Sequence, residues 1–268
     1  MTGGGAVQPT MVVAVYEDDY GFVPEQSLGR PSFDAYWRQV HAQASELLEA
    51  GTTPLLRPLV DVEFRRFCRD SGLLPGSAAA FEAYAQRRLP RDELVEFDGC
   101  PVEPLRRLML HERDTAAMMW ACDLFLRAAV DQYGDEAKAW AFDSAWRVLD
   151  AVLAGASAGD TIIFISKLGD GQPLGSYGLA VGDEAGAASD ARRDRTRLST
   201  LLSASLMVPA SGVLALRSER EDGATVQVWE YARQRFAPSE HGRLILEAHG
   251  GDEASVQYVP GFELPQPA

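Results

Sequence analysis

The chain has 268 residues, of which 46% are hydrophobic, and its formal net charge at pH 7 is −14. This hydrophobic content is enough for a sizeable buried core, which excludes the disordered and fibrous classes. The acidic balance opposes binding to nucleic acid or to an anionic membrane, because a negative surface repels phosphate unless a local basic patch overrides it.

The cysteines and the amino terminus indicate the compartment. Cys68, Cys100 and Cys122 are an odd number at wide spacing without a CxxC pair, which predicts neither a disulfide framework nor a structural zinc site. The chain starts with no basic region followed by an apolar core, and no later segment is typical of a membrane span. We therefore expect a soluble, cytoplasmic protein with no membrane partner.

The amino-terminal part begins with a tail and one strand. Residues 1–10 are small, polar and rich in glycine, which predicts a flexible tail. Met11–Tyr16 is a short apolar run rich in β-branched residues, as in a strand buried on both faces. A helix with Ser32 as its N-cap follows, and its apolar residues recur at spacings of three and four until Gly51.

A second strand and two short helices come next. Leu55–Val60 is a possible strand, and Pro58 would confine it to the edge of a sheet. The expected helices are Val62–Asp70, capped by Asp61 and ended by Gly72, and Ala78–Arg88, capped by Ser77.

The paired helices over residues 62–88 favour two interpretations. Two short helices joined by a tight turn are typical of a helix-turn-helix that reads DNA, but also of an ordinary helical hairpin with solvated arginines. The acidic balance of the chain favours the hairpin. The basic residues concerned are Arg65, Arg66, Arg69, Arg87 and Arg88.

The segment Thr115–Val130 is apolar almost all the way round a helical wheel, which predicts a central helix surrounded by other protein elements. Asp123 and Arg127 oppose a lipid environment and, at a spacing of four, can pair with each other. We expect this helix to run from about Leu105 or His111 to Tyr133.

From Gly155 the pattern changes from helical periods to strand runs separated by turns. We expect an α+β fold: a helical part over 11–155, built around the buried helix and one or two strands, and a carboxyl-terminal antiparallel sheet with one covering helix over 156–268. The two parts form separate domains or share one core. The expected elements after the helix that follows Gly134 are strands Ile162–Ile165 and Tyr177–Val181, a helix from Asp190, and a meander of Val213–Arg217, Thr225–Tyr231, Leu244–Ala248 and Ser255–Val259.

Acidic residues follow two of the expected buried strands. Glu17, Asp18 and Asp19 come after the first strand, and Asp170 comes after Ile162–Ile165. Carboxylates at rigid strand ends are common ligands of Mg²⁺, and these would converge if the two strands were parallel neighbours. The alternative is that both acidic loops are solvated.

Two further groups of residues are candidates for chemistry. His111 and Asp114 lie three residues apart on one helical face, so the acid could orient the imidazole as a general base or both could share a metal. The alternative is an ordinary charged helix start. Arg192 and Arg193 could clamp an anion or form a solvated face paired with neighbouring acids.

These features lead to three functional hypotheses. The first is a cytoplasmic regulatory or scaffolding protein that acts through protein–protein contacts, as a homo-oligomer, since the chain lacks a catalytic signature and carries five Trp and eleven Phe. The second is a metal-assisted hydrolase of a small phosphorylated or anionic metabolite, with Mg²⁺ on the strand-end acids, His111 as general base, and Arg192 or Arg193 on the substrate. The third is DNA binding through helices 62–88.

Overall fold

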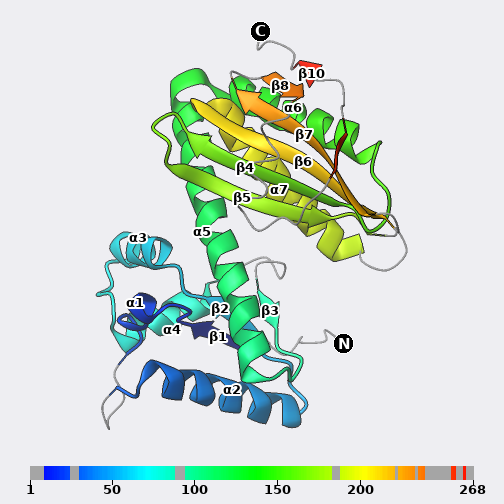
Figure 1. Ribbon diagram of the computed structural model, residues 1–268. Helices are drawn as coiled ribbons and strands as arrows, with labels where there is room; N and C mark the ends of the chain where they lie inside the picture. Colours follow the sequence, from blue (N-terminus) through cyan, green and yellow to red (C-terminus); the bar gives the residue numbers. More distant parts are fainter. Residues whose placement is uncertain are drawn as a thin grey trace, which may run out of the picture. The chain divides into compact units, whose positions relative to one another are not determined.

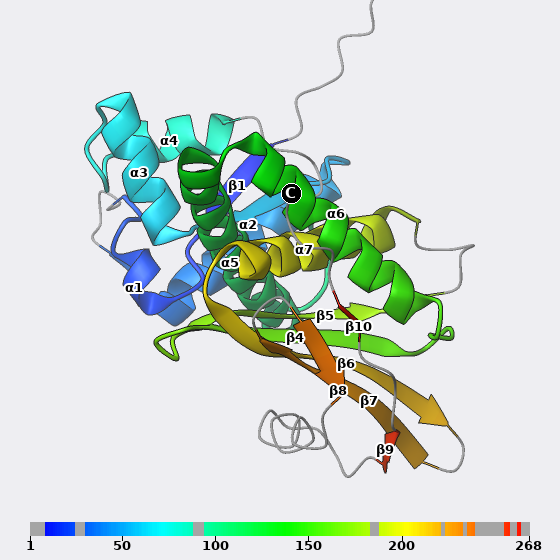
Figure 2. The same cartoon turned by 90° about the horizontal axis from the view of Figure 1, so that it is seen from above.

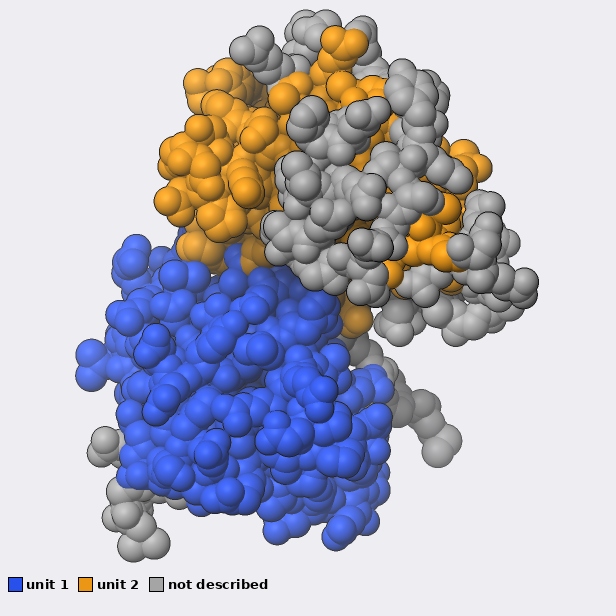
Figure 3. All heavy atoms as spheres, in the orientation of Figure 1, with its two compact units in different colours: residues 1–117 blue, residues 118–268 orange. Residues whose placement is uncertain are grey.

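The computed structural model describes residues 9–24, 30–87, 94–182, 188–220, 223–232, 235–238, 255–257 and 262–263. The chain divides into two compact units, Met1–Ala117 (unit 1) and Met118–Ala268 (unit 2), coloured separately in Figure 3. The division falls within one helix, α5 (Val102–Tyr133). The domain boundary expected at residues 155 and 156 lies later in the chain and stays a prediction.

Unit 1 contains a small sheet with strand order β1-β2-β3 (Figure 1). Strands β1 and β2 are parallel, and β3 is antiparallel to β2. Because the chain returns through helices between two parallel strands, the carboxyl ends of β1 and β2 meet at one edge of the sheet. The elements are β1 (Thr10–Val13), α1 (Glu17–Tyr20), α2 (Phe33–Glu49), β2 (Leu55–Pro58), α3 (Asp61–Ser71), α4 (Ala78–Gln86) and β3 (Val95–Glu96).

Strand β2 is the middle strand of this sheet, so the expectation that Pro58 confines it to an edge is wrong. Pro58 is the last residue of β2 and lies opposite Val13, and the next residue, Leu59, donates its N–H to the Val13 carbonyl at 2.8 Å. On the other side, β3 pairs with Leu55 and Leu56. Within the described residues Pro58 therefore lies beyond the β2–β3 pairing. Its missing N–H costs no hydrogen bond there, because β3 does not extend opposite it.

The helix caps of unit 1 agree with the sequence in most cases. Ser32 and Ser77 accept hydrogen bonds from the backbone N–H three residues on, at 3.3 and 3.2 Å, and Gly72 ends α3 in the left-handed region at φ 66°. The exception is Asp61, because the N-cap of α3 is Val60 and no side chain caps it. The carboxylate of Asp61 points to arginine side chains instead.

The core of unit 1 is aromatic. Trp37, Phe64, Tyr84 and Phe97 are fully buried, and the rings of Phe64 and Tyr84 meet edge to face with centroids 5.1 Å apart. In β1, Val13 is fully buried, as the apolar run predicts.

Unit 2 contains a sheet with strand order β10-β8-β7-β6-β4-β5, in which β9 also pairs with β7. Neighbouring strands are antiparallel except β9, which is parallel to β7, so the last expected strand does not continue the meander. The prediction of an α+β fold is confirmed. The elements are α6 (Asp135–Leu153), β4 (Thr161–Leu168), β5 (Pro173–Ala180), α7 (Ala188–Met207), β6 (Ala210–Arg220), β7 (Gly223–Ala232), β8 (Arg235–Pro238), β9 (Ser255–Gln257) and β10 (Phe262–Glu263). The strand expected at Leu244–Ala248 lies outside the described residues.

The helices of unit 2 cover one face of the sheet, on which α6 and α7 both lie (Figure 2). Helix α5 contributes a buried stripe, Met118, Cys122 and Leu126, whose spacing of four is that of one helical face. The residues between them are mostly half-buried, so the helix packs through this stripe rather than all round. Asp123 and Arg127 pair at 2.7 Å, as their spacing predicts.

Helices α6 and α7 pack through small side chains. Ala141, Ala145 and Ala204 are fully buried, and the hydroxyl of Ser203 contacts the Ala141 carbonyl at 3.5 Å. Small residues allow the two helix backbones to approach closely, which makes this packing sensitive to added volume.

In the part of the chain that the structure describes, no helix combines the length and the apolar character needed to cross a membrane.

Candidate functional site

A cleft of about 380 Å³ lies in unit 1 beside the carboxyl ends of β1 and β2. Helix α1, which follows β1, and the first residue of α3, which follows β2, supply its acids, while α3 and α5 each supply an arginine. Ligands of open α/β sheets bind at such strand ends, because the loops there are held by rigid strands. The lining residues are Tyr16, Glu17, Asp18, Asp19, Phe22, Asp61, Arg65 and Arg113.

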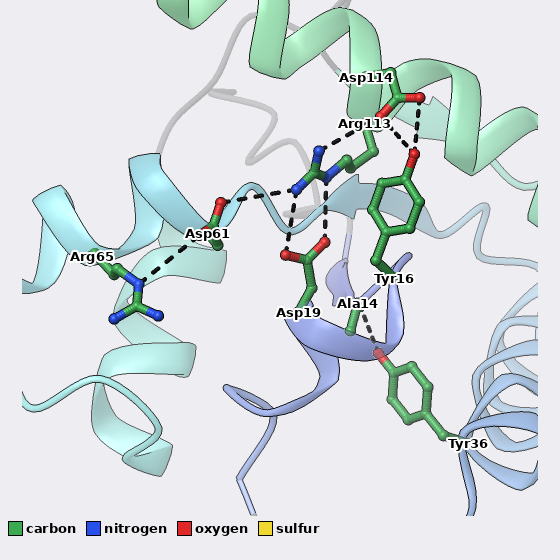
Figure 4. A network of polar contacts seen from close by, with 8 residues as sticks. All are labelled: Ala14, Tyr16, Asp19, Tyr36, Asp61, Arg65, Arg113 and Asp114. Carbon is green, nitrogen blue, oxygen red and sulfur yellow. Dashed lines mark hydrogen bonds and ion pairs between the residues drawn. The ribbon is translucent and has the colours of Figure 1, made fainter.

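Arg113 is the centre of the polar network in this cleft (Figure 4). Its Nε and Nη2 donate to the two carboxylate oxygens of Asp19 at 3.2 and 3.4 Å. Its Nη2 is also 3.8 Å from Asp61 Oδ1, and its Nη1 is 3.5 Å from Asp114 Oδ1. One guanidinium group therefore balances carboxylates from α1, α3 and α5.

Tyr16 connects the end of the β1 segment to α5. Its hydroxyl donates to the carboxylate of Asp114 at 3.0 Å, and the Arg113 guanidinium carbon lies 4.6 Å from the centre of its ring. Burial raises the pKa of Tyr16, and the hydrogen bond to Asp114 raises it further. The tyrosine therefore stays a neutral hydrogen-bond donor at neutral pH.

Asp19 is the buried acid of the cleft, with 2% of its surface exposed. Burial raises the pKa of its carboxyl above the ordinary value, although Arg113 acts in the opposite direction. The charge of Asp19 is therefore costly to hold inside the fold, and Arg113 is the group that stabilises it.

Arg65 and Phe22 form the other wall of the cleft. Arg65 Nε is 3.9 Å from Asp61 Oδ2, and its guanidinium carbon lies 4.6 Å from the centre of the Phe22 ring. An arginine over an aromatic face thus occurs twice in this cleft, here and at Tyr16, and this contact is favourable for a cation.

The lining holds four carboxylates against two guanidinium groups, a net charge of −2 when all are ionised. Asp19 is buried at the base, whereas Glu17 and Asp18 are exposed at the surface. The accessible part of the cleft is therefore acidic.

The structure brings together three of the four acids predicted to bind a metal. Glu17, Asp18 and Asp19 line the cleft, but Asp170 lies in the turn between β4 and β5 of unit 2, where its carboxylate accepts the Gln172 N–H at 3.0 Å. The condition for all four acids to converge, that the two strands are parallel neighbours, is not met, because β1 and β4 belong to different sheets. Among the described residues, no group of three or more His, Cys, Asp or Glu is arranged to hold a metal ion.

His111 is an exposed residue of α5 and is not part of the cleft lining. Asp114, its expected partner, is engaged with Tyr16 and Arg113. The role of His111 as a general base stays a prediction.

Arg192 and Arg193 lie on α7 of unit 2. Arg192 is exposed, and Arg193 Nε is 3.8 Å from Asp194 Oδ1. Asp194 also accepts the Tyr177 hydroxyl at 2.7 Å, and burial raises the pKa of Tyr177 to about 12. These contacts hold α7 to β5, and anion binding by the two arginines stays a prediction.

The arginines of the α3–α4 hairpin face acids of the same hairpin. Arg66 is 3.6 Å from Asp70, and Arg87 is 2.7 Å from Glu63. Arg88 lies outside the described residues. Because these pairs offset positive charge, they leave less of it for DNA phosphates.

A buried arginine of unit 1, Arg57, was not singled out by the sequence. Arg57 of β2 is 2% exposed, donates to the Tyr84 carbonyl at 2.7 Å and to Glu63 at 3.1 Å, and lies 3.5 Å from the centre of the Tyr84 ring. Burial lowers its pKa. It holds β2 to α3 and α4.

Sequence reasoning found the acids after β1 but missed Asp61, Arg113 and Tyr16 as parts of the same cleft. A signal for Asp61 was present: it follows the second strand of a strand–helix–strand unit, as Asp19 follows the first. No local pattern marks Arg113, because it reaches the acids from a helix 94 residues away in the chain.

Fold and site together define an α+β protein with an acidic, partly aromatic cleft at the ends of two parallel strands. A scan against protein-family models and searches among curated proteins and among solved structures found no match to this chain.

Proposed function

We propose that this chain is a regulatory or scaffolding protein that acts through protein–protein contacts, and that the cleft of unit 1 binds a basic segment of its protein partner. The observation that carries the proposal is the cleft lining, with exposed Glu17 and Asp18 at the surface and four carboxylates against two arginines.

The chemistry of the lining favours a cation over an anion. Carboxylates attract the guanidinium or ammonium head of an arginine or lysine, and the rings of Tyr16 and Phe22 provide faces for that head and its apolar stem. The contact already exists within the cleft, where Arg113 and Arg65 lie over these two rings. The charge of −14 on the whole chain also steers basic partners toward it.

Calorimetric titration with a capped arginine–glycine peptide tests this proposal, and the matching glutamate–glycine peptide serves as the ligand control. We expect the arginine peptide to bind with an affinity that falls as salt is added, and the glutamate peptide not to bind. The double variant Glu17→Gln/Asp18→Asn is expected to weaken binding about tenfold, since each exposed charge pair contributes roughly 0.2–1 kcal/mol.

The matched control is Glu46→Gln/Glu49→Gln, which removes two exposed acids from α2 of the same unit. It should leave the affinity nearly unchanged. Equal losses in the two double variants would mean that only the overall charge attracts the peptide, and the cleft proposal would then be wrong.

The metal-assisted hydrolase is a second candidate, supported by the position of Glu17, Asp18 and Asp19 at a strand end. It requires a bound ion before an anionic substrate can approach these acids. Thermal unfolding with Mg²⁺, Mn²⁺ and Zn²⁺ distinguishes the two candidates. An ion present at a hundred times its dissociation constant stabilises a protein by about 2.7 kcal/mol, whereas an unchanged melting temperature with all three ions favours the binding protein.

A further inference from the structure

Strand β5 forms one end of the sheet of unit 2. It pairs with β4, and within the described residues no strand pairs with its other edge. The N–H of Val181 donates to the Asp160 carbonyl of the β4 side at 2.7 Å. Because successive residues of a strand direct their N–H and C=O groups to opposite edges, those of Ser176, Gly178 and Ala180 lie on the outer edge.

This outer edge lacks the features that usually protect an edge strand. Such strands carry charged residues, an internal proline or a bulge, which prevent pairing with another chain. Strand β5 carries no charged residue, and its proline is the first residue, Pro173. The register shift in its pairing with β4 lies at Ser166 and Lys167, so Ser176–Ala180 is regularly paired.

The strand is also held firmly on its inner face. Leu174, Tyr177 and Leu179 are buried in the core of unit 2, while Ser176, Gly178 and Ala180 alternate with them and are exposed. The edge is therefore a rigid and regular template with small side chains on its open face.

We propose that β5 pairs with β5 of a second copy of this chain, antiparallel, about a two-fold axis at Gly178. In this register Gly178 faces Gly178 of the other copy and Ser176 faces Ala180, so the outward N–H groups of these residues meet carbonyls, and the space above Gly178 is open.

The register of β5 favours a second copy as the occupant of this edge, because antiparallel pairing of the strand with itself places small, uncharged residues opposite one another. Two chains of net charge −14 repel each other, and this repulsion is smallest where they meet at a neutral strand. The self-pairing register needs no further complementary surface. The proposal is independent of the cleft, which lies in unit 1.

Sedimentation equilibrium of the full chain provides the first test. The wild type is expected to sediment at twice the chain mass of 29.2 kDa. Gly178→Lys places a charge on the two-fold axis, where it faces its own copy, and a side chain at this position meets no other atom in the unit. This variant is expected to raise the dimer dissociation constant at least tenfold.

The control is Ala139→Lys, which adds the same charge at an exposed position of α6. It should remain dimeric. A monomeric wild type from micromolar to millimolar concentration, or a Gly178→Lys variant as dimeric as the wild type, would overturn the proposal.

Cysteine cross-linking identifies the surface that makes the dimer. Cys68 and Cys122 are buried, so a Cys100→Ser background removes the remaining half-buried thiol. In that background Gly178→Cys should form a disulfide between copies on mild oxidation, because Cα atoms of such a pair lie about 5.5 Å apart. Ala139→Cys should not. A dimer in which Gly178→Cys fails to cross-link pairs through another surface, and β5 self-pairing is then wrong.

Discussion

The two units bury different kinds of polar side chain. In unit 1 the buried polar residues include the charged Asp19, Arg57 and Glu112. Among the described residues of unit 2 they are serines, apart from Asp160. A serine hydroxyl finds its partner on the preceding helical turn, as Ser203 does on the Ser199 carbonyl at 2.7 Å, whereas a buried charge needs an opposite charge from elsewhere.

This difference supports the proposal that the cleft of unit 1 is the functional site. Buried charges reduce stability unless they are paired, and they occur preferentially at functional sites. Two of the three in unit 1, Asp19 and Arg57, belong to networks that join the ends of the parallel strands to helices. In unit 2 a buried serine such as Ser203 pairs locally, and α6 and α7 pack closely through small residues.

The largest expected effect concerns the charge network of unit 1. Arg113→Met leaves Asp19 buried without its main partner, and we expect unit 1 to lose about 3 kcal/mol of stability at neutral pH. Urea unfolding followed by ¹⁹F NMR with fluorotryptophan measures it, since Trp37 is the one tryptophan of unit 1. Arg107→Met, an exposed change on the same helix, is the control and should have little effect.

The same variant has a pH dependence of definite sign. The pKa of Asp19 is already raised by burial, and loss of Arg113 raises it further. The destabilisation is therefore fully present above this raised pKa and decreases as the pH falls through it toward the ordinary value of an aspartate. A loss of stability that is the same from pH 4 to pH 8 would contradict the role given to Asp19.

The next effect concerns the packing of unit 2. A Cβ at Gly212 of β6 would meet the carbonyl oxygen of Ile165 in β4, which is backbone and cannot move aside. We expect Gly212→Ala to destabilise unit 2 by about 2 kcal/mol, reported by Trp229 in the same ¹⁹F experiment and independent of pH. Gly182→Ala, where the added methyl meets open space outside the strands, is the control. Comparable stability of both variants would show that the close packing of β6 on β4 contributes little.

The smallest effect is local to one helix of unit 1. Ser77 caps α4 by accepting the Ala80 N–H at 3.2 Å, and Ser77→Ala should cost about 1 kcal/mol. Ser71→Ala, at the end of α3, is the matched exposed change. We expect the loss of unfolding free energy to appear in the signal of Trp37 and not in that of Trp229. An equal loss in both signals would mean that the two units do not unfold separately.

Most of the fold could be predicted because its signals are local. Helix starts at Ser32 and Ser77, the stop at Gly72 and the buried strand runs depend on a few neighbouring residues. Strand order depends on distant residues, and two predictions about it were wrong. The sequence predicts that Pro58 confines its strand to the edge of a sheet, and that the last strand continues an antiparallel meander. The short β8 was not predicted, and β9 returns parallel to β7.

Only the local part of the candidate site could be predicted from the sequence. The acids after β1 follow from a strand-end rule, but their partner acid depends on which strand lies beside β1. That neighbour is β2, which brings Asp61 to the cleft, and not β4, which ends near Asp170. No local sequence pattern predicts that Arg113 contacts these acids, because it is 94 residues from Asp19 in the chain.

The central claim is that the cleft of unit 1 binds a basic protein segment, and amide chemical shifts test it most directly. In TROSY spectra of the ¹⁵N-labelled chain titrated with the arginine–glycine peptide, the account predicts that the largest shift changes occur at Tyr16–Phe22, Asp61–Arg65 and Arg113. Shift changes that are absent, or that gather on another surface while these amides stay in place, would contradict it.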